Sequence, residues 1–103
     1  MRGPSHDPAR GPMILTLLVR SYCHLCDEMR DALAPVAARH SATVVEIDLD
    51  ARPEWETRFG DRVPVLMLGS APLGEVLAEL RLDTASLERR LARPPVASGP
   101  DFR

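Results

Sequence analysis

Hydrophobic and polar positions along the chain follow two periods that predict alternating strands and helices. Residues 13–19 form a nearly continuous apolar run, which is typical of a strand covered on both faces of a sheet. Residues 24–39 carry an apolar stripe at helical spacing, and this stripe predicts a helix. Over residues 43–49, Val45 and Ile47 alternate with more polar neighbours, so we expect a second strand with at least one buried face.

A short helix is predicted next. Pro53 suits its first position, and Gly60 lies just past its end. Trp55 and Phe59 form an apolar pair at i, i+4, and we expect both to be core or helix-packing residues.

A hairpin and a last helix are predicted to close the fold. Strands are expected over 63–68 and 72–81, antiparallel to each other, and Asp83 is a good N-cap for a helix over 84–92. The order β-α-β-α-β-β-α indicates an α/β fold with a central four-stranded mixed sheet flanked by helices. The two βαβ-type connections favour parallel pairing first, with the hairpin adding an antiparallel edge.

Composition bounds the location and the class of partner. The 103 residues suit one domain, which we place at 13–92 between a disordered leader, 1–12, and a disordered tail, 93–103. The net charge of −2 implies no strong attraction to nucleic acid. The chain has no apolar run long enough for a membrane span and no signal-peptide core, so we expect a cytoplasmic protein.

The only two cysteines, Cys23 and Cys26, stand three residues apart where the first strand gives way to the first helix. A helix N-terminus favours the thiolate, which is the reactive form of cysteine. The spacing lets the second cysteine attack a mixed disulfide made by the first. The pair alone allows redox, metal-binding or structural interpretations.

With these elements in place, the chain resembles the thioredoxin superfamily, and within it the small glutaredoxin-like proteins. The resemblance covers about residues 13–92 and is carried by four features. They are Cys23-x-x-Cys26, the segment Ile47–Pro53 before a short helix, Val63-Pro64 at a strand start, and the closing hairpin and helix. The resemblance implies a thioredoxin-like fold, with Pro64 cis and across from Cys23, and with the Val63 backbone available to pair with a bound peptide or glutathione.

The chain also departs from the family patterns. Tyr22 stands where thioredoxins usually have a tryptophan, and Leu17 and Glu46 replace their buried aspartate and its lysine partner. Arg20 matches a basic residue of glutaredoxins, whereas their glycine–aspartate turn is only partly echoed, at Leu73-Gly74-Glu75 and Leu82-Asp83.

Several side chains near the cysteines have two interpretations each. His24 either lends positive charge to the Cys23 thiolate or is a solvent-exposed filler. Arg20 either binds a glutathione carboxylate or is a strand-end surface arginine. Glu46 either accepts a proton from Cys26 or is a surface carboxylate. With Tyr22, Val63 and Pro64, we take Arg20 and His24 as candidate substrate-binding residues.

The sequence favours a thiol–disulfide oxidoreductase or electron carrier in which Cys23 is the nucleophile and Cys26 resolves. We expect a monomer that needs no cofactor, exchanges electrons with a disulfide-bearing protein or glutathione disulfide, and is reduced by glutathione or a reductase. Two alternatives remain. One is a metal or iron–sulfur carrier that uses the same cysteines, and the other is a redox-inactive binding module on the same fold.

Overall fold

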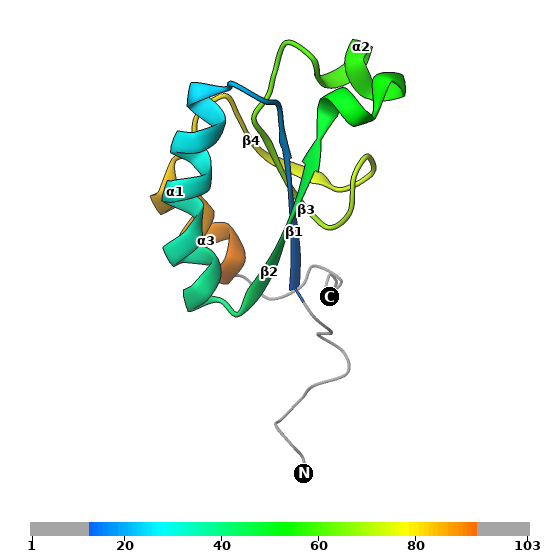
Figure 1. Cartoon of the computed structure of the whole chain (residues 1–103). Helices are drawn as coiled ribbons and strands as arrows, with labels where there is room; N and C mark the ends of the chain where they lie inside the picture. The colour runs from blue at the N-terminus through cyan, green and yellow to red at the C-terminus, as the bar shows by residue number, and fades with distance from the viewer. Residues whose placement is uncertain (1–12, 93–103) are drawn as a thin grey trace.

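The computed structural model describes residues 13–92 and has the predicted element order β-α-β-α-β-β-α (Figure 1). The strands are β1 (Met13–Val19), β2 (Ala42–Asp48), β3 (Val65–Leu68) and β4 (Glu75–Glu79). The helices are α1 (His24–Arg39), α2 (Glu56–Phe59) and α3 (Thr84–Ala92), and the 3₁₀ turns η1 (Leu49–Ala51) and η2 (Pro53–Trp55) precede α2. The predicted leader and tail lie outside the described residues.

The four strands form one mixed sheet in the order β2-β1-β3-β4. β1 and β2 are parallel, as predicted, and Leu17 lies opposite Glu46. β3 is antiparallel to β1, with Val65 opposite Leu18, so the expectation of a second parallel pairing was wrong. The reason is visible in Figure 1: α2 sits at the end of the sheet where β2 finishes, so β3 starts at that end and runs back.

Both faces of β1 are covered, which explains its continuous apolar run. Leu15 and Leu17 pack in a cluster with residues of α1 and α3, which lie on the same side of the sheet (Figure 1). Leu18 points to the other face, where it packs with Phe59 and three further buried residues. These are Leu49, Val65 and Met67. The prediction that Phe59 is a core residue is confirmed, and Trp55 packs against the same cluster while staying partly exposed.

The edge strand β2 is less buried than its pattern suggested. Ile47 packs against the α2-side cluster, but the Val45 side chain is 41% exposed. Val44, which was not predicted to be buried, instead packs against the α1-side cluster. The alternating pattern therefore identified a strand correctly. On the side of the sheet where α2 lies, however, only the last part of β2, around Ile47, is covered.

The hairpin strands are shorter than predicted. β3 begins two residues after the expected Val63, and β4 is limited to Glu75–Glu79. Gly69 has a φ of 96°, a left-handed conformation that suits glycine, and it starts the turn between the strands. Leu80 has a φ of 68°, which takes the chain out of the extended conformation and ends β4.

The last helix begins as predicted. The Asp83 carboxylate accepts hydrogen bonds from the backbone N–H groups of Ala85 at 3.1 Å and Ser86 at 3.3 Å. Oδ2 of Asp83 also accepts the Ser86 hydroxyl at 2.9 Å, and these bonds with Ser86 lower the pKa of Asp83. The Asp83 side chain therefore caps the N-terminus of α3. None of the helices within residues 13–92 combines the length and the apolar character needed to cross a membrane.

A charged cluster joins the end of α1 to α3. The Glu88 carboxylate pairs with His40 Nε2 at 2.7 Å and accepts a hydrogen bond from Arg39 Nε at 2.7 Å. These two partners, His40 first, lower the pKa of Glu88. The pKa of Glu88 is lower in the folded protein than in the unfolded chain. The charged cluster therefore stabilises the fold at pH values above the unfolded-state pKa, and this stabilisation is lost as the pH falls through the folded-state pKa.

We therefore expect Glu88→Gln to lower the urea midpoint of unfolding modestly near neutral pH. The difference from wild type should shrink as the pH drops below the usual glutamate pKa of 4.5 and disappear once Glu88 is protonated in the fold. Urea titrations of both proteins over a pH series measure this. Parallel curves with a constant gap across the whole series would contradict it.

Candidate redox site

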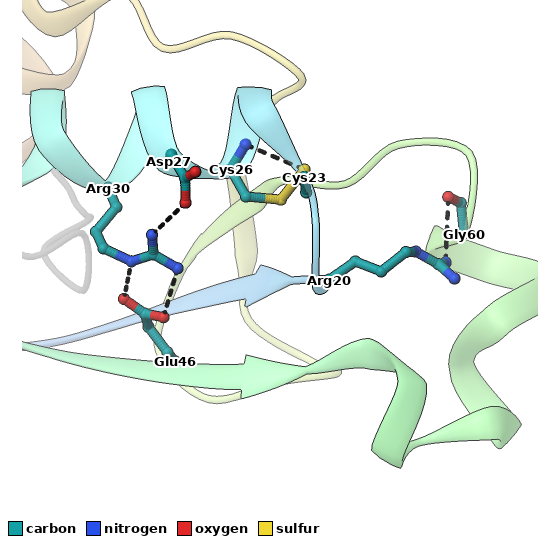
Figure 2. The surroundings of a disulfide bond; sticks show 7 residues. All are labelled: Arg20, Cys23, Cys26, Asp27, Arg30, Glu46 and Gly60. Atoms are coloured by element: carbon teal, nitrogen blue, oxygen red, sulfur yellow. Dashed lines mark hydrogen bonds and ion pairs between the residues drawn. A yellow bond between two sulfur atoms is a disulfide. The ribbon is translucent and has the colours of Figure 1, made fainter.

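The site lies between the end of β1 and the start of α1, and Figure 2 shows its surroundings. Cys23 is the N-cap of α1, and Cys26 lies one turn inside the helix. The two form a disulfide, with their Cα atoms 5.1 Å apart. Cys23 is partly exposed, whereas Cys26 is only 1% exposed. Only Cys23 can therefore be reached from outside, and Cys26 can react only with its neighbour.

The first turn of α1 is organised around Cys23. Its Sγ accepts the Cys26 backbone N–H at 3.1 Å, and its carbonyl accepts the Asp27 N–H at 3.2 Å. The sulfur thus occupies the place that an oxygen side chain takes at most helix N-termini. α1 is 16 residues long, so its full N-terminal dipole acts on this sulfur and favours a negative charge there.

Val63 and Pro64 lie at the same end of the sheet. Val65 pairs with Leu18, so the two residues before Val65 continue alongside the end of β1, which leads to Cys23. The Val63–Pro64 peptide bond is cis, as is Ala71–Pro72. The Pro64 carbonyl accepts the Leu80 N–H at 2.8 Å, which ties the end of β4 to this segment.

The Val63 backbone has no such partner. Within residues 13–92, neither its N–H nor its C=O makes a backbone hydrogen bond. An unpaired backbone N–H and C=O can form hydrogen bonds with an added strand. The three segments 20–23, 63–64 and 80 therefore lie at the end of the sheet from which the chain leads to Cys23, although they are up to sixty residues apart in sequence.

Arg20 is held by the fold itself. Nη1 bonds Asp50 Oδ1 at 2.9 Å, and Nη2 bonds the Glu56 carboxylate at 2.9 Å and 3.1 Å. Nη2 also approaches the Gly60 carbonyl at 3.5 Å, and Figure 2 shows the side chain extending toward Gly60, away from the disulfide. The hydrogen bond with Glu56 raises the pKa of Arg20. Of the two interpretations of Arg20, this geometry favours a structural one, because the arginine joins β1 to η1 and α2.

On the other side of the disulfide, Arg30 bridges α1 and β2. Its Nε and Nη2 bond the two oxygens of Glu46 at 2.6 Å and 3.0 Å, and Nη1 bonds Asp27 at 2.7 Å (Figure 2). The hydrogen bond with Glu46 is the main cause of the raised pKa of Arg30. Glu46 lies opposite Leu17 and faces α1, so it is a partly exposed carboxylate in a bidentate pair, and its proton-acceptor role stays a prediction.

Arg30 was not among the predicted site residues, although the sequence carries a signal for it. It stands four residues after Cys26, which places the two side chains on one face of α1. The neighbouring strand carries Glu46 as its only acidic residue before Asp48. An arginine on the cysteine face and a carboxylate on the adjacent parallel strand form an expected pair.

The two residues on either side of Cys23 point outward. Tyr22 is fully exposed and has a φ of 58°. His24 Nε2 lies 2.8 Å from Glu28 Oε2, one turn along α1, and the His24 side chain is 85% exposed. Leu80, on the Pro64 side, is 44% exposed.

Residues 13–92 contain no cluster of three or more His, Cys, Asp or Glu side chains arranged to hold a metal ion.

Comparison with known proteins places these features in context. A family model described as a glutaredoxin-like domain (DUF836) matches residues 14–92. The X-ray structure of the structural-genomics target XcR50 from X. campestris is 34% identical and covers 79% of this chain and 99% of that chain, with a TM-score of 0.62. An uncharacterized protein from Mycobacterium tuberculosis (strain CDC 1551 / Oshkosh) is 29% identical over 92 residues, or 84% of this chain and 91% of the relative.

A more distant structure defines the fold. The oxidized form of mitochondrial thioredoxin 3 from Saccharomyces cerevisiae is 17% identical, covers 77% of this chain and 76% of that chain, and has a TM-score of 0.55. At this identity the similarity concerns the fold alone. It confirms the predicted thioredoxin-like arrangement of a four-stranded mixed sheet with flanking helices.

Proposed function

This chain belongs to the glutaredoxin-like domain family, and on that premise we propose that it is a thiol–disulfide oxidoreductase with Cys23 as nucleophile and Cys26 as resolving cysteine. The observation that carries the proposal is the asymmetry of the pair. Cys23 is reachable and caps a long helix, whereas Cys26 is buried against it. A two-step exchange needs this division between an entering and a resolving thiol.

The reaction balances over the two cysteines. The Cys23 thiolate attacks one sulfur of a substrate disulfide, the substrate S–S bond breaks, and the leaving sulfur takes a proton. Cys26, losing its own proton, attacks Cys23 Sγ, forms the intramolecular disulfide and releases the second substrate thiol. The substrate gains two electrons and the cysteine pair loses two. A thiol reductant, either glutathione or a reductase, then returns the pair to the dithiol.

Substrate contacts are proposed for the segments that converge on Cys23. The unpaired N–H and C=O of Val63 support strand-like pairing with a bound chain, next to Pro64. Tyr22 offers an exposed aromatic face beside the nucleophile. His24, at the solvent-facing end of α1, lies within the area such a substrate would cover. The proposal includes a cytoplasmic location, because a reductant-driven pair needs a compartment that keeps thiols reduced.

The test uses a small neutral disulfide, bis(2-hydroxyethyl) disulfide, mixed with the purified, fully reduced chain. We expect one equivalent of the disulfide to be reduced as Cys23 and Cys26 become oxidised, measured by acid quench and counting of free thiols. Elemental analysis and absorbance spectra of the same preparation test the metal-carrier alternative. Absence of oxidation together with bound metal would replace the proposal with that alternative, and absence of both would leave the binding-module interpretation.

A further inference from the structure

We infer that the site selects disulfides carried on protein segments with apolar residues beside the cysteine, and discriminates against glutathione disulfide. This inference rests on the proposed function and names the substrate class of the same site. Glutathione is a small tripeptide with two carboxylates and one ammonium group. A site that recognises it must offer an available cation and an available anion beside the reactive thiol.

The cation nearest to Cys23 in sequence is not available. The Arg20 guanidinium donates hydrogen bonds to the carboxylates of Asp50 and Glu56. It makes a third contact with the Gly60 carbonyl. A glutathione carboxylate would have to displace two carboxylates already held within hydrogen-bond distance by a fixed turn and helix. Arg62, one residue before Val63, is paired in the same way with Glu79 at 3.2 Å.

The anion expected after β4 is also not available. Asp83 is the carboxylate that partly echoes the glycine–aspartate turn, and within residues 13–92 its carboxylate accepts hydrogen bonds only from the first turn of α3. Its capping role lowers its pKa and fixes its orientation toward the helix. An ammonium group arriving at this turn would compete with three existing hydrogen bonds.

The unpaired charge that lies nearest to Val63 along the chain has the wrong sign for glutathione. Asp61 lies two residues before Val63, is exposed, and makes no ion pair with another described residue. Glutathione disulfide is a net dianion at neutral pH, so an unpaired carboxylate beside its docking segment repels it. A protein segment can present an uncharged or basic sequence there.

The positive side of the selection comes from exposed apolar groups. Tyr22 is fully exposed next to Cys23, and Leu80 is 44% exposed and bound through its N–H to Pro64. The open Val63 backbone belongs to the same convergence of segments. An extended protein chain satisfies the backbone groups and covers Tyr22 and Leu80 with apolar side chains, whereas glutathione carries no large apolar group.

The experiment compares single-turnover oxidation of the reduced chain by four disulfides. They are bis(2-hydroxyethyl) disulfide, glutathione disulfide, and two synthetic peptide disulfides that differ only in having leucine or glutamate beside the cysteine. We expect the leucine peptide to react fastest and glutathione disulfide to react about tenfold more slowly than the neutral small disulfide, because Asp61 repels the two net negative charges of glutathione disulfide. Glutathione disulfide reacting as fast as the leucine peptide would overturn the inference.

Variants locate the cause. Asp50→Asn with Glu56→Gln releases Arg20, and it should raise the glutathione disulfide rate several-fold while leaving the neutral disulfide rate unchanged. The matched control is Asp31→Asn with Glu54→Gln, which removes the same charge from exposed carboxylates that do not contact Arg20. Equal rates for the two double variants would overturn the role given to Arg20.

Arg81 provides a second check. It follows Leu80, is exposed and makes no ion pair with another described residue, but it lies beyond the residue that bonds Pro64, and no contact joins it to Cys23 within residues 13–92. If Arg81→Ala slowed the reaction with glutathione disulfide but not with the neutral disulfide, a glutathione subsite would exist and the inference would be wrong. We expect no such difference. Failure of the proposed function itself is distinguishable, because then none of the four disulfides would oxidise the wild-type chain.

Discussion

Cys23→Ser is expected to reduce disulfide-reductase turnover to the uncatalysed rate, while Cys26→Ser traps a mixed disulfide on Cys23. Serine keeps the size and the N-cap hydrogen bond of Cys23 but has no thiolate to attack a disulfide. In Cys26→Ser the first step remains, and the buried serine cannot resolve it. Mass spectrometry of the intact chain after reaction with a protein disulfide distinguishes the two variants.

The two variants serve as matched controls because each removes one sulfur from the same first turn. Thermal unfolding of both, compared with reduced wild type, separates loss of chemistry from loss of fold. Turnover retained by Cys23→Ser would contradict the assignment of the nucleophile. A mixed disulfide found on Cys26 in Cys23→Ser would mean that the roles are reversed.

Phe59→Ala is expected to have the largest effect on stability, about 3–5 kcal/mol. Phe59 is fully buried, and it anchors the short helix α2 to a cluster that includes Leu18 and Met67. Because a domain of this size has a total stability of about 5–15 kcal/mol, the substitution removes a large share of it. Urea titration followed by the fluorescence of Trp55, which packs against the same cluster, measures the loss.

Thr57→Ala is the matched control for this substitution, because Thr57 is exposed on the same helix. We expect its free energy of unfolding to stay within about 0.5 kcal/mol of the wild-type value, which is the range typical of surface substitutions. A Phe59→Ala protein as stable as the Thr57→Ala control would contradict the cluster as the anchor of α2.

Most of the fold was predictable because its signals are local. The apolar run of β1, the helical stripe of α1 and the Asp83 cap of α3 each depend on neighbours within one element. The direction of β3 was not predictable in this way, because it depends on where α2 sits relative to the sheet. The exposure of Val45 was missed for the same reason: alternation shows which residues share a face, but not whether another element covers that face.

The candidate site divides along the same line. The cysteine spacing predicted the pair, the helix boundary and the order of reaction, and Val63-Pro64 predicted the neighbouring segment. Arg20 and Glu46, in contrast, each had two interpretations that no local pattern separated. Their partners, Asp50 for Arg20 and Arg30 for Glu46, come from other elements.

By itself, the sequence determined a cysteine pair with C-x-x-C spacing at a strand–helix boundary, because spacing along one helix and capping of its first turn are short-range properties. The tertiary structure decided which sulfur is reachable and which charges near it remain available. A long charged side chain chooses among carboxylates brought close by folding, such as Asp50 and Glu56 around Arg20, which lie 30 and 36 residues away in the chain. That choice sets the charge beside Cys23, and through it the class of disulfide that we propose the site accepts.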